Sequence, residues 1–381
     1  MKQVVVFGKD SYNTLGLIRS LGQNNVPVFL LLQKSSVPEY CIHSKYVIAY
    51  KKVNNVECGI NYLKTEYPTE SSTKTIIIPT SDLIASELDK NYSELSSKFI
   101  FPNVGGNLSK IMDKGLMTKL AKESGLPVPQ TTEYSCGESL PDNMVYPCMV
   151  KPAKSIAGSK EEMRVCNNRE ELYKAVSYQE KGHQLLLQQY IRKEYDLLLL
   201  GSRCPNGKVF LSGVFKKLRW FSMGNDGSYG LITTNYEQWF NRCNIEEFLK
   251  KLNYIGPFSI EFGVEHGIPY FYEINLRNDG TSHYFDKTGF CNAYAWVMEC
   301  TGHEVDYNGN GEYWFIDEFG DFMNVVAKVI TYRQWRQDKK KAVAFKYKNP
   351  NDKKPLLIIR PYMCAFVAKN ALKVLKNKCN K

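Results

Sequence analysis

The sequence predicts an α/β protein that begins with a parallel sheet and continues with strands that include an antiparallel pair and a hairpin. Apolar runs at 2–8, 26–32 and 74–82 alternate with helix-like segments, a pattern typical of a parallel sheet. Further along, the strand-like segments 256–264 and 268–277 are separated by a tight Glu-His-Gly turn, which predicts a hairpin.

A helix is expected between these two regions. Residues 108–125 have helical spacing, with Ser109 as the N-cap and Gly125 as the residue that stops the helix. Four more strands are expected at 146–153, 183–191, 194–203 and 209–221, the last one leading into the glycine-rich loop 224–230.

Composition indicates a cytoplasmic globular protein. At 381 residues the chain suits two or three subdomains, and 43% hydrophobic with 23% charged residues is ordinary for such a protein. No run approaches the ~18 apolar residues of a membrane-spanning helix, and the N-terminal run is too short for a secretory signal. The eleven cysteines form no C-x-x-C pair. We therefore expect free thiols in a reducing compartment rather than a disulfide scaffold or metal cluster.

The net charge of +11 is concentrated at the C-terminal end. Residues 333–381 hold twelve Lys and three Arg against two Asp, so residues 1–332 have a net charge of −2. The segment 355–381 mixes apolar residues with lysines at helical spacing, as do helices that lie on anionic membranes. The alternative is a helix packed on the protein with its lysines in solvent. No nucleic-acid-binding module is recognisable, so a nucleic acid partner is not expected.

Familiar catalytic motifs are absent from the chain. There is no G-x-x-x-x-G-K-[ST], G-x-G-x-x-G, HExxH or G-x-S-x-G sequence. The missing glycine fingerprint argues against a dinucleotide-dependent reductase.

The predicted hairpin carries a cluster of oxygen ligands. Glu261 lies on its first strand, while Glu273 and Asn275 are two residues apart on the second and therefore share a face. If the turn brings Glu261 beside them, these oxygens suit Mg²⁺. Arg277 continues the row and would bind a phosphate or a developing oxyanion. The alternative is a solvated outer face on which Glu and Arg side chains pair.

Two further segments have the chemistry of a nucleotide site. Lys151 ends an apolar strand, and the loop SIAGSK that follows offers backbone N–H groups to phosphates. The strand 183–191 ends in polar residues and leads to Glu194, so its edge would hydrogen-bond adenine while the carboxylate holds ribose hydroxyls. Each feature also has a purely structural interpretation: a strand end, a connector and a solvated charge.

The order of these segments resembles the ATP-grasp superfamily over most of the chain. The resemblance is carried by IMDKGLMTKLAKESGLPVPQT, YPCMVKPAKSIAGSK, LLLQQYIRKEYD, GPFSIEFGV and YFYEINLRNDGTS. It implies a pre-ATP-grasp domain at 1–108, a two-lobed ATP-grasp domain at 109–310 and a C-terminal extension at 311–381. Within the second domain it implies a linker helix at 109–125, an ATP-binding lobe at about 126–195 and a metal-binding lobe at about 196–310.

The resemblance also implies site residues. They are Lys114, Lys151, Ser155, Ser159, Lys160 and Lys217 at the phosphates; Gln188, Gln189, Tyr190, Ile191 and Glu194 at adenine and ribose; Glu261, Glu273 and Asn275 at Mg²⁺ or Mn²⁺; and Arg277, Lys151 and Arg219 as catalytic groups. Gln188 and Gln189 depart from the pattern, since many members have a charged residue at this hinge. The loops after Gly8 and Ser81, at strand carboxyl ends, are the candidates for substrate binding.

The implied activity is ATP-dependent joining of a carboxylate to an amine through an acyl phosphate. At a finer level, VVVFGKDSYNTLGLIRSLG and EINLRNDGTSHYF are similar to D-aspartate ligase and related carboxylate–amine ligases of the cell envelope. This implies small-molecule carboxylate and amine substrates. Three further points stay open: whether a substrate is a lipid-linked or nucleotide-linked precursor, whether the protein is a homodimer, and whether the tail contacts the inner face of the membrane. Two other functions also stay open: an ATP-binding regulator without turnover, and a ligase that uses a thiol or bicarbonate.

Overall fold

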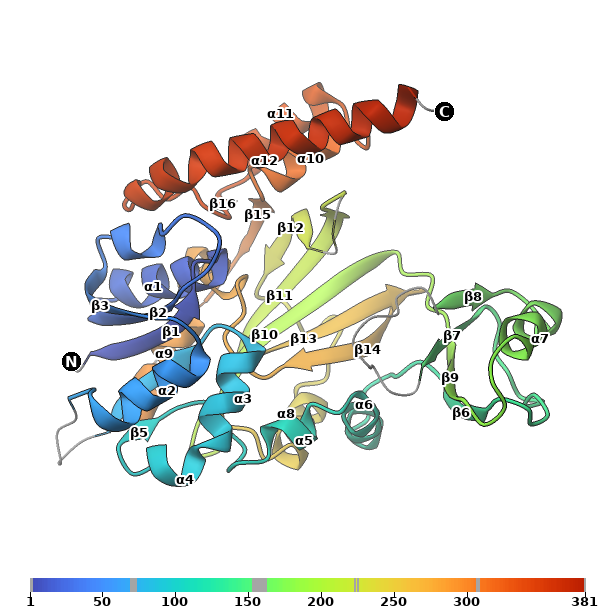
Figure 1. Ribbon diagram of the computed structural model, residues 1–381. Coiled ribbons are helices and arrows are strands. Elements are labelled where there is room, and N and C mark those ends of the chain that lie inside the picture. Colours follow the sequence, from blue (N-terminus) through green and yellow to red (C-terminus); the bar gives the residue numbers. More distant parts are fainter. Residues whose placement is uncertain are drawn as a thin grey trace.

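Three β-sheets organise the described part of the chain, and each takes its strands from its own stretch of the sequence (Figure 1). The computed structural model describes residues 3–68, 74–152, 163–222, 224, 226–305 and 309–379. Figure 1 shows the N-terminal sheet and the smallest sheet on opposite sides of the largest one, with the C-terminal helix across the top. The expected parallel N-terminal sheet, the antiparallel pair after residue 209 and the hairpin at 256–277 are confirmed.

The first sheet is parallel and has the strand order β3-β2-β1-β4-β5. Its strands are β1 (Val4–Lys9), β2 (Val28–Gln33), β3 (Val47–Val53), β4 (Thr75–Pro79) and β5 (Phe99–Ile100). Along β1, Val4 and Val6 enter one core while Val5 and Phe7 enter another. Burial on both faces explains why the sequence shows a continuous apolar run rather than alternation.

Helices cover both faces of this sheet. They are α1 (Tyr12–Gln23) and α9 (Asn292–Cys300) on one face, and α2 (Val56–Thr65), α3 (Asp82–Lys90) and α4 (Tyr92–Leu95) on the other. Ser11 and Ser81 cap α1 and α3 by accepting hydrogen bonds from backbone N–H groups. The start of each helix therefore follows directly on a strand, β1 or β4.

The predicted helix at 108–125 is two helices, α5 (Leu108–Ile111) and α6 (Lys114–Glu123). The break occurs because Asp113 is extended and accepts a hydrogen bond from the N–H of Leu116 at 2.9 Å, which makes it the N-cap of α6. The expectation that Ser109 is the N-cap is therefore wrong. Gly125, with a φ of 80°, follows the end of α6 as predicted.

The smallest sheet is antiparallel, with the strand order β6-β9-β7-β8. Its strands are β6 (Thr131–Ser135), β7 (Cys148–Pro152), β8 (Arg164–Cys166) and β9 (Gln184–Gln189), and α7 (Arg169–Ser177) packs on it. Leu172 and Val176 of α7 share a core with Val150 and Leu187 of the strands.

The largest sheet has the order β14-β13-β10-β11-β12-β15-β16 and is antiparallel except for its last pair. Its strands are β10 (Tyr195–Arg203), β11 (Val209–Trp220), β12 (Gly227–Thr233), β13 (Gly256–Glu265), β14 (Ile268–Asn275), β15 (Glu312–Ile316) and β16 (Ala344–Phe345). One face is covered by α6 and by α8 (Arg242–Lys251). The other face receives aromatic side chains from the 3₁₀ helix η3 (Ser282–Thr288).

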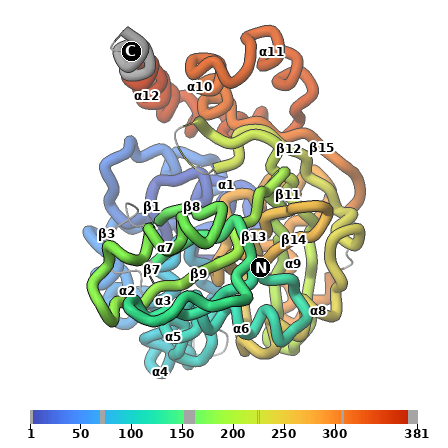
Figure 2. Tube along the Cα trace, turned by 90° about the vertical axis from the view of Figure 1, so that its right-hand side faces the viewer, coloured from blue at the N-terminus to red at the C-terminus, as the bar shows by residue number. Residues whose placement is uncertain are grey.

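Residues beyond 310 are more closely integrated than an appended extension. Through β15 and β16 they complete the largest sheet, and they continue into α10 (Gly320–Val326), α11 (Tyr332–Lys341) and α12 (Lys354–Cys379). Figure 2 shows these three helices as a group at one end of the molecule. The partition of the chain at 108 and 310 stays a prediction.

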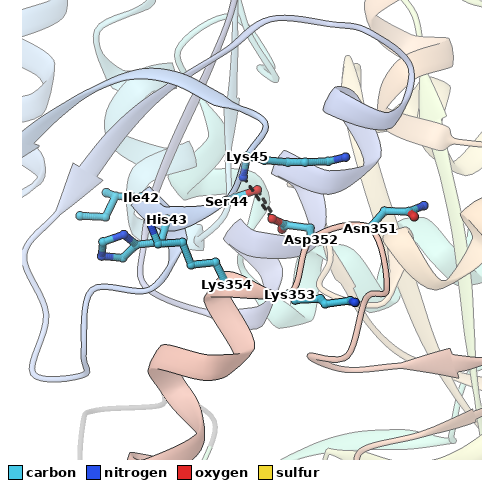
Figure 3. Close-up of a pocket in the computed structure, with 8 residues that line it drawn as sticks. All are labelled: Ile42, His43, Ser44, Lys45, Asn351, Asp352, Lys353 and Lys354. Atoms are coloured by element: carbon cyan, nitrogen blue, oxygen red, sulfur yellow. Dashed lines mark hydrogen bonds between the residues drawn. The ribbon is translucent and has the colours of Figure 1, made fainter.

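A buried ion pair fastens the start of α12 to the N-terminal unit. Asp352 accepts hydrogen bonds from Arg19 Nε at 3.0 Å and from Ser44 Oγ at 2.9 Å. Figure 3 shows the contact with Ser44. The side chains of Arg19 and Asp352 are each 1% exposed. Removing either partner would leave a buried charge unpaired, so this contact strongly constrains where α12 begins.

Two expectations from composition also bear on the fold. The ten cysteines whose side chains are described are free thiols, as predicted. Among the helices in the described ranges, none combines the length and apolar character needed to cross a membrane.

Candidate active site

The β13–β14 hairpin places the predicted metal ligands opposite one another. Glu261 is the register partner of Glu273, and Ser259 is the partner of Asn275. Residues directly opposite on antiparallel strands have Cβ atoms about 4.5–5.5 Å apart. Asn275 Nδ2 donates to Ser259 Oγ at 3.2 Å, which orients the amide oxygen of Asn275 away from that hydroxyl. The two carboxylates and the amide oxygen are thus brought together by local pairing.

Lysines from two other elements neutralise the opposed carboxylates. Lys217 Nζ lies 3.5 Å from Glu261 Oε2, and Lys114 Nζ lies 3.8 Å from Glu273 Oε2. Burial raises the pKa of Glu261, while the Lys217 ammonium lowers it and the Glu273 carboxylate raises it again. A pair of carboxylates facing each other repels unless a cation lies between or beside them.

A hard divalent cation fits this donor set. Mg²⁺ prefers carboxylate and carbonyl oxygens, and it keeps positions for water and phosphate instead of demanding a complete protein cage. In the described part of the chain, no group of three or more His, Cys, Asp or Glu side chains is arranged to hold a metal. The candidate set is therefore two carboxylates and one amide, which suits an ion that arrives together with a phosphate ligand.

Arg277 is held at the end of the hairpin by acids from two segments. Its Nε donates to Asp82 Oδ1 at 2.9 Å, and its Nη1 lies 3.7 Å from Asp279 Oδ2. Burial alone would lower the pKa of Arg277, but the carboxylates of Asp279 and Asp82 raise it above its ordinary value. One Nη2–H also donates to Asn275 Oδ1 at 3.2 Å. A permanent positive charge is thus oriented beside the candidate metal ligands.

On the small sheet, Lys151 and Gln188 lie side by side. Lys151 Nζ donates to Gln188 Oε1 at 2.9 Å, and Gln188 Nε2 donates to Thr131 Oγ1 at 2.8 Å. Burial lowers the pKa of Lys151, and the nearby ammonium of Lys114 lowers it further. The two lysines expected at the phosphates are therefore close enough for the charge of Lys114 to affect Lys151.

The predicted adenine and ribose residues lie where the small sheet meets the large one. The backbone N–H of Tyr190 donates to Pro147 O at 2.8 Å, and Ile191 is buried. Glu194 Oε1 accepts a hydrogen bond from the N–H of His266 at 3.0 Å, and its side chain is 51% exposed. Gln189 Oε1 accepts from the N–H of Gln130 at 3.2 Å. Ser155, Ser159 and Lys160 lie outside the described residues.

Arg219 and Lys217 diverge although they are two residues apart on β11. Register shifts on both sides of Arg219 interrupt the alternation of the strand. Lys217 reaches Glu261, whereas Arg219 forms ion pairs with Asp321 at 2.7 Å and Asp338 at 2.9 Å. The structure thus gives Arg219 a place among buried acids of the C-terminal helices, away from the hairpin ligands.

A pocket of about 60 Å³ opens beside the hairpin and contains groups that were not anticipated. Its lining mixes charged, aromatic and aliphatic residues and consists of Tyr12, Leu198, Phe215, Lys217, Asp226, Gly227, Glu261, Asp279, Thr281, Tyr284, Phe315 and Lys346. The sequence could have identified Asp279 as a site residue, because it follows Asn275 within the same short motif. It could not have identified Lys346, since this residue is one of many lysines in a basic segment.

Asp279 is a buried anion with a defined set of donors. Burial would raise the pKa of Asp279, but Arg277 and the hydroxyl and N–H of Thr281 lower it below its ordinary value. Ser259 Oγ also donates to Asp279 Oδ2 at 3.0 Å. Asp279 therefore stays ionised and links the arginine to the hairpin.

No protein-family model matches the chain, and no curated protein matches it. Solved structures do match its fold. The biotin carboxylase domain of the 2-oxoglutarate carboxylase of Hydrogenobacter thermophilus, solved with MgADP and bicarbonate, aligns with 81% of this chain and 73% of its own, at 17% identity and a TM-score of 0.59. An L-amino acid ligase from Bacillus licheniformis covers 78% of this chain and 74% of its own, at 12% identity and a TM-score of 0.53.

A third neighbour is the N5-carboxyaminoimidazole ribonucleotide synthetase of Thermus thermophilus. It covers 82% of both chains at 12% identity, with a TM-score of 0.60. These neighbours are ATP-grasp enzymes, and the present chain has the ATP-grasp fold. The fold expected from the sequence resemblance is thereby confirmed.

Proposed function

We propose that the chain is an ATP-dependent ligase that joins a carboxylate to an amine. One observation carries the proposal: Glu261 and Glu273 face each other on the hairpin, beside Asn275, with Lys217 and Lys114 as their cationic partners. In an ATP-grasp fold this arrangement suits a metal–nucleotide complex.

The proposed roles of the side chains follow from their charges. Glu261, Glu273 and Asn275 would hold Mg²⁺, or Mn²⁺ in its place, and the ion would supply charge neutralisation for the phosphates. Lys114 and Lys151, which interact electrostatically, would bind phosphate oxygens. The residues from Gln188 to Ile191 would lie along adenine, and Glu194 would hold the ribose.

Arg277 would stabilise the negative charge on the transferred phosphoryl group. A carboxylate oxygen of the substrate attacks the γ-phosphorus of ATP, the bond to the β-phosphate oxygen breaks, and ADP leaves. The amine then attacks the acyl carbon, loses a proton and expels inorganic phosphate, which leaves an amide. The chain contributes positioning and charge, because Arg277 is already oriented by Asp82 and Asp279.

An amino acid is the amine substrate that the sequence resemblance favours, and an L-amino acid ligase is among the structural neighbours. The acceptor that we propose is a cell-envelope or polysaccharide precursor. Bicarbonate is a second candidate for the carboxylate, since a neighbouring biotin carboxylase domain was solved with MgADP and bicarbonate. An ATP-binding regulator without turnover is the alternative from a different functional class.

The C-terminal helix supports a further part of the proposal, a cytoplasmic enzyme with peripheral membrane contact. On α12 the apolar side chains of Leu357, Tyr362 and Phe366 are 64%, 41% and 36% exposed, while Ile359 is buried against the protein. Arg360 and Lys369 are exposed on the same helix. Exposed apolar and basic side chains together favour an anionic lipid surface.

The test is release of ADP and phosphate from Mg-ATP in the presence of D- and L-amino acid pools, with and without envelope precursors, and with bicarbonate as a separate arm. Ligation predicts release that depends on one pool and an acceptor whose mass rises by one amino-acid residue. Release with bicarbonate alone would favour the second candidate. Tight nucleotide binding without turnover in every arm would favour the regulator.

A further inference from the structure

A second charged cluster includes Lys346, which lines the same pocket as Glu261. It is built by the parallel pair β15 and β16, in which Ile316 is the register partner of Phe345. Asp317 and Lys346 directly follow these two residues, so both side chains emerge at the carboxyl ends of adjacent strands. Lys346 Nζ lies 2.9 Å from Asp317 Oδ2.

Lys346 is almost fully enclosed. Its side chain is 11% exposed and that of Asp317 is 6% exposed. The ammonium also lies 4.2 Å from the centroid of the Tyr12 ring, a cation–π contact. Burial alone would lower the pKa of Lys346, but Asp317 and the neighbouring Tyr12 raise it well above its ordinary value. The pocket therefore has a permanent cation in its lining.

The partners of this cation differ in how firmly they are held. Asp317 Oδ1 accepts hydrogen bonds from the N–H groups of Phe319 and Gly320, so its carboxylate is fixed by the backbone. Asp226 Oδ2 lies 3.6 Å from Lys346 Nζ, but its side chain is 60% exposed. A bound carboxylate could replace Asp226 as the second partner of Lys346 without exposing a buried charge.

The size and position of the pocket bear on which ligand could bind beside Lys346. At about 60 Å³ the pocket has room for a small polar group such as a carboxylate, since about 10–15 Å³ of cavity already holds one water molecule. Glu261 and Lys217 line the same pocket from the hairpin side. A ligand held at Lys346 would therefore lie next to the candidate metal ligands.

We propose that Lys346, together with Tyr12, is a substrate-binding residue that receives the carboxylate group of a small organic acid, amino acids included. The proposal rests on the proposed function, because the reacting substrate must lie beside the metal–nucleotide site. The proposal assigns a part of substrate recognition to residues beyond 310, which the sequence resemblance implied to be a C-terminal extension. The competing explanation is that Lys346 only fastens β16 to β15 through Asp317.

Isothermal titration calorimetry on the full chain separates these explanations. Lys346→Met alone would leave Asp317 buried without its cation, so the informative pair is Asp317→Asn and the double variant Asp317→Asn/Lys346→Met. Lys348→Met is the matched control, because Lys348 is exposed and only two residues away. Each protein is saturated with MgADP and titrated with acetate, glycine, D- and L-alanine, and D- and L-aspartate.

We expect at least one of these carboxylates to bind the wild type, Asp317→Asn and Lys348→Met. In the double variant its affinity should fall about tenfold or more, with MgADP affinity within about twofold of the wild type. Equal carboxylate affinity in Asp317→Asn and the double variant would overturn the proposal. So would a wild type that binds MgADP but none of the six probes. A wild type that does not bind MgADP would instead contradict the proposed function on which this site rests.

Discussion

The β13–β14 hairpin and the small sheet carry the two halves of the proposed nucleotide site in different ways. On the hairpin, charged side chains have charged partners from elsewhere in the fold: Lys217 for Glu261, and Asp82 for Arg277. On the small sheet, Lys151 has the neutral amide of Gln188 as a partner. Between the two regions, Glu194 is half exposed and held by a backbone N–H group.

This difference indicates where the site is organised before a ligand arrives. Ion pairs with segments that are distant in the sequence fix the positions of the hairpin side chains. Little further ordering of these side chains is therefore needed when a substrate binds beside the hairpin. Among the described residues, the hydrogen-bond partner of Lys151 is the neutral amide of Gln188, and burial lowers the pKa of Lys151. A phosphate would bring a negative charge to Lys151. We therefore infer a preorganised catalytic end and a nucleotide end that is completed by its ligand.

Removing a carboxylate from the hairpin should have the largest effect. In Glu273→Ala we expect ATP turnover to fall by about 100-fold or more, because the opposed pair of candidate metal ligands is lost. The melting temperature should change little, since the Glu273 side chain is 43% exposed and its ion pair with Lys114 is long. Glu133→Ala, at an exposed position of β6, is the control for both measurements. Wild-type turnover in Glu273→Ala would remove the metal site from the proposal.

The same substitution at two arginines tests whether catalysis belongs to the hairpin. Arg277→Lys keeps the charge but loses the two-pronged contact with Asp82, so we expect about a tenfold loss of turnover with MgADP affinity unchanged. Arg219→Lys should instead lower the free energy of unfolding by about 1–3 kcal/mol, because Asp321 and Asp338 are buried partners.

Turnover measured per folded molecule distinguishes these two variants. It should be near the wild-type rate in Arg219→Lys and reduced in Arg277→Lys. Urea denaturation gives the matching stability values. A large loss of turnover in Arg219→Lys without a loss of stability would support the predicted catalytic role of Arg219.

The pH dependence of nucleotide binding tests the small sheet. The phosphates need the ammonium form of Lys151, and burial with the nearby Lys114 lowers its pKa below the ordinary 10.5. MgADP affinity should therefore be greatest at lower pH and fall as the pH rises through this lowered pKa. We expect a decrease of about three- to tenfold between neutral pH and pH 10, measured by calorimetry. Lys151→Arg should bind MgADP with no decrease over this range, because arginine stays charged.

The smallest expected effect concerns α12. Leu357→Glu changes a side chain that is 64% exposed, so the free energy of unfolding should shift by no more than about 0.5 kcal/mol. If the helix lies on lipid, sedimentation with phosphatidylserine vesicles should decrease several-fold. Ile48→Glu is the control, because Ile48 is 61% exposed on an edge strand of the N-terminal sheet. Equal sedimentation of both variants and the wild type would leave α12 as a packed helix.

Short-range patterns in the sequence were enough to predict most elements and part of the site. The hairpin and the common face of Glu273 and Asn275 follow from strand alternation and one tight turn, which act over a few residues. The N-terminal strands were found because burial on both faces leaves continuous apolar runs. The break at Asp113 was missed, since an aspartate in a helical pattern can be either a surface residue or the cap of a new helix.

The sequence by itself therefore determined the ATP-grasp pattern, the parallel N-terminal unit and the row of candidate oxygen ligands on one hairpin. Only the tertiary structure decided which lysine and arginine side chains lie beside these candidate ligands. Asp82 and Arg277 pair although they are 195 residues apart, and a register shift on β11 sends Lys217 to the hairpin but Arg219 to the C-terminal helices. Lys346 is set beside Tyr12 by the pairing of β16 with β15. Such contacts depend on the packing of distant segments, and local periodicity carries no information about that packing.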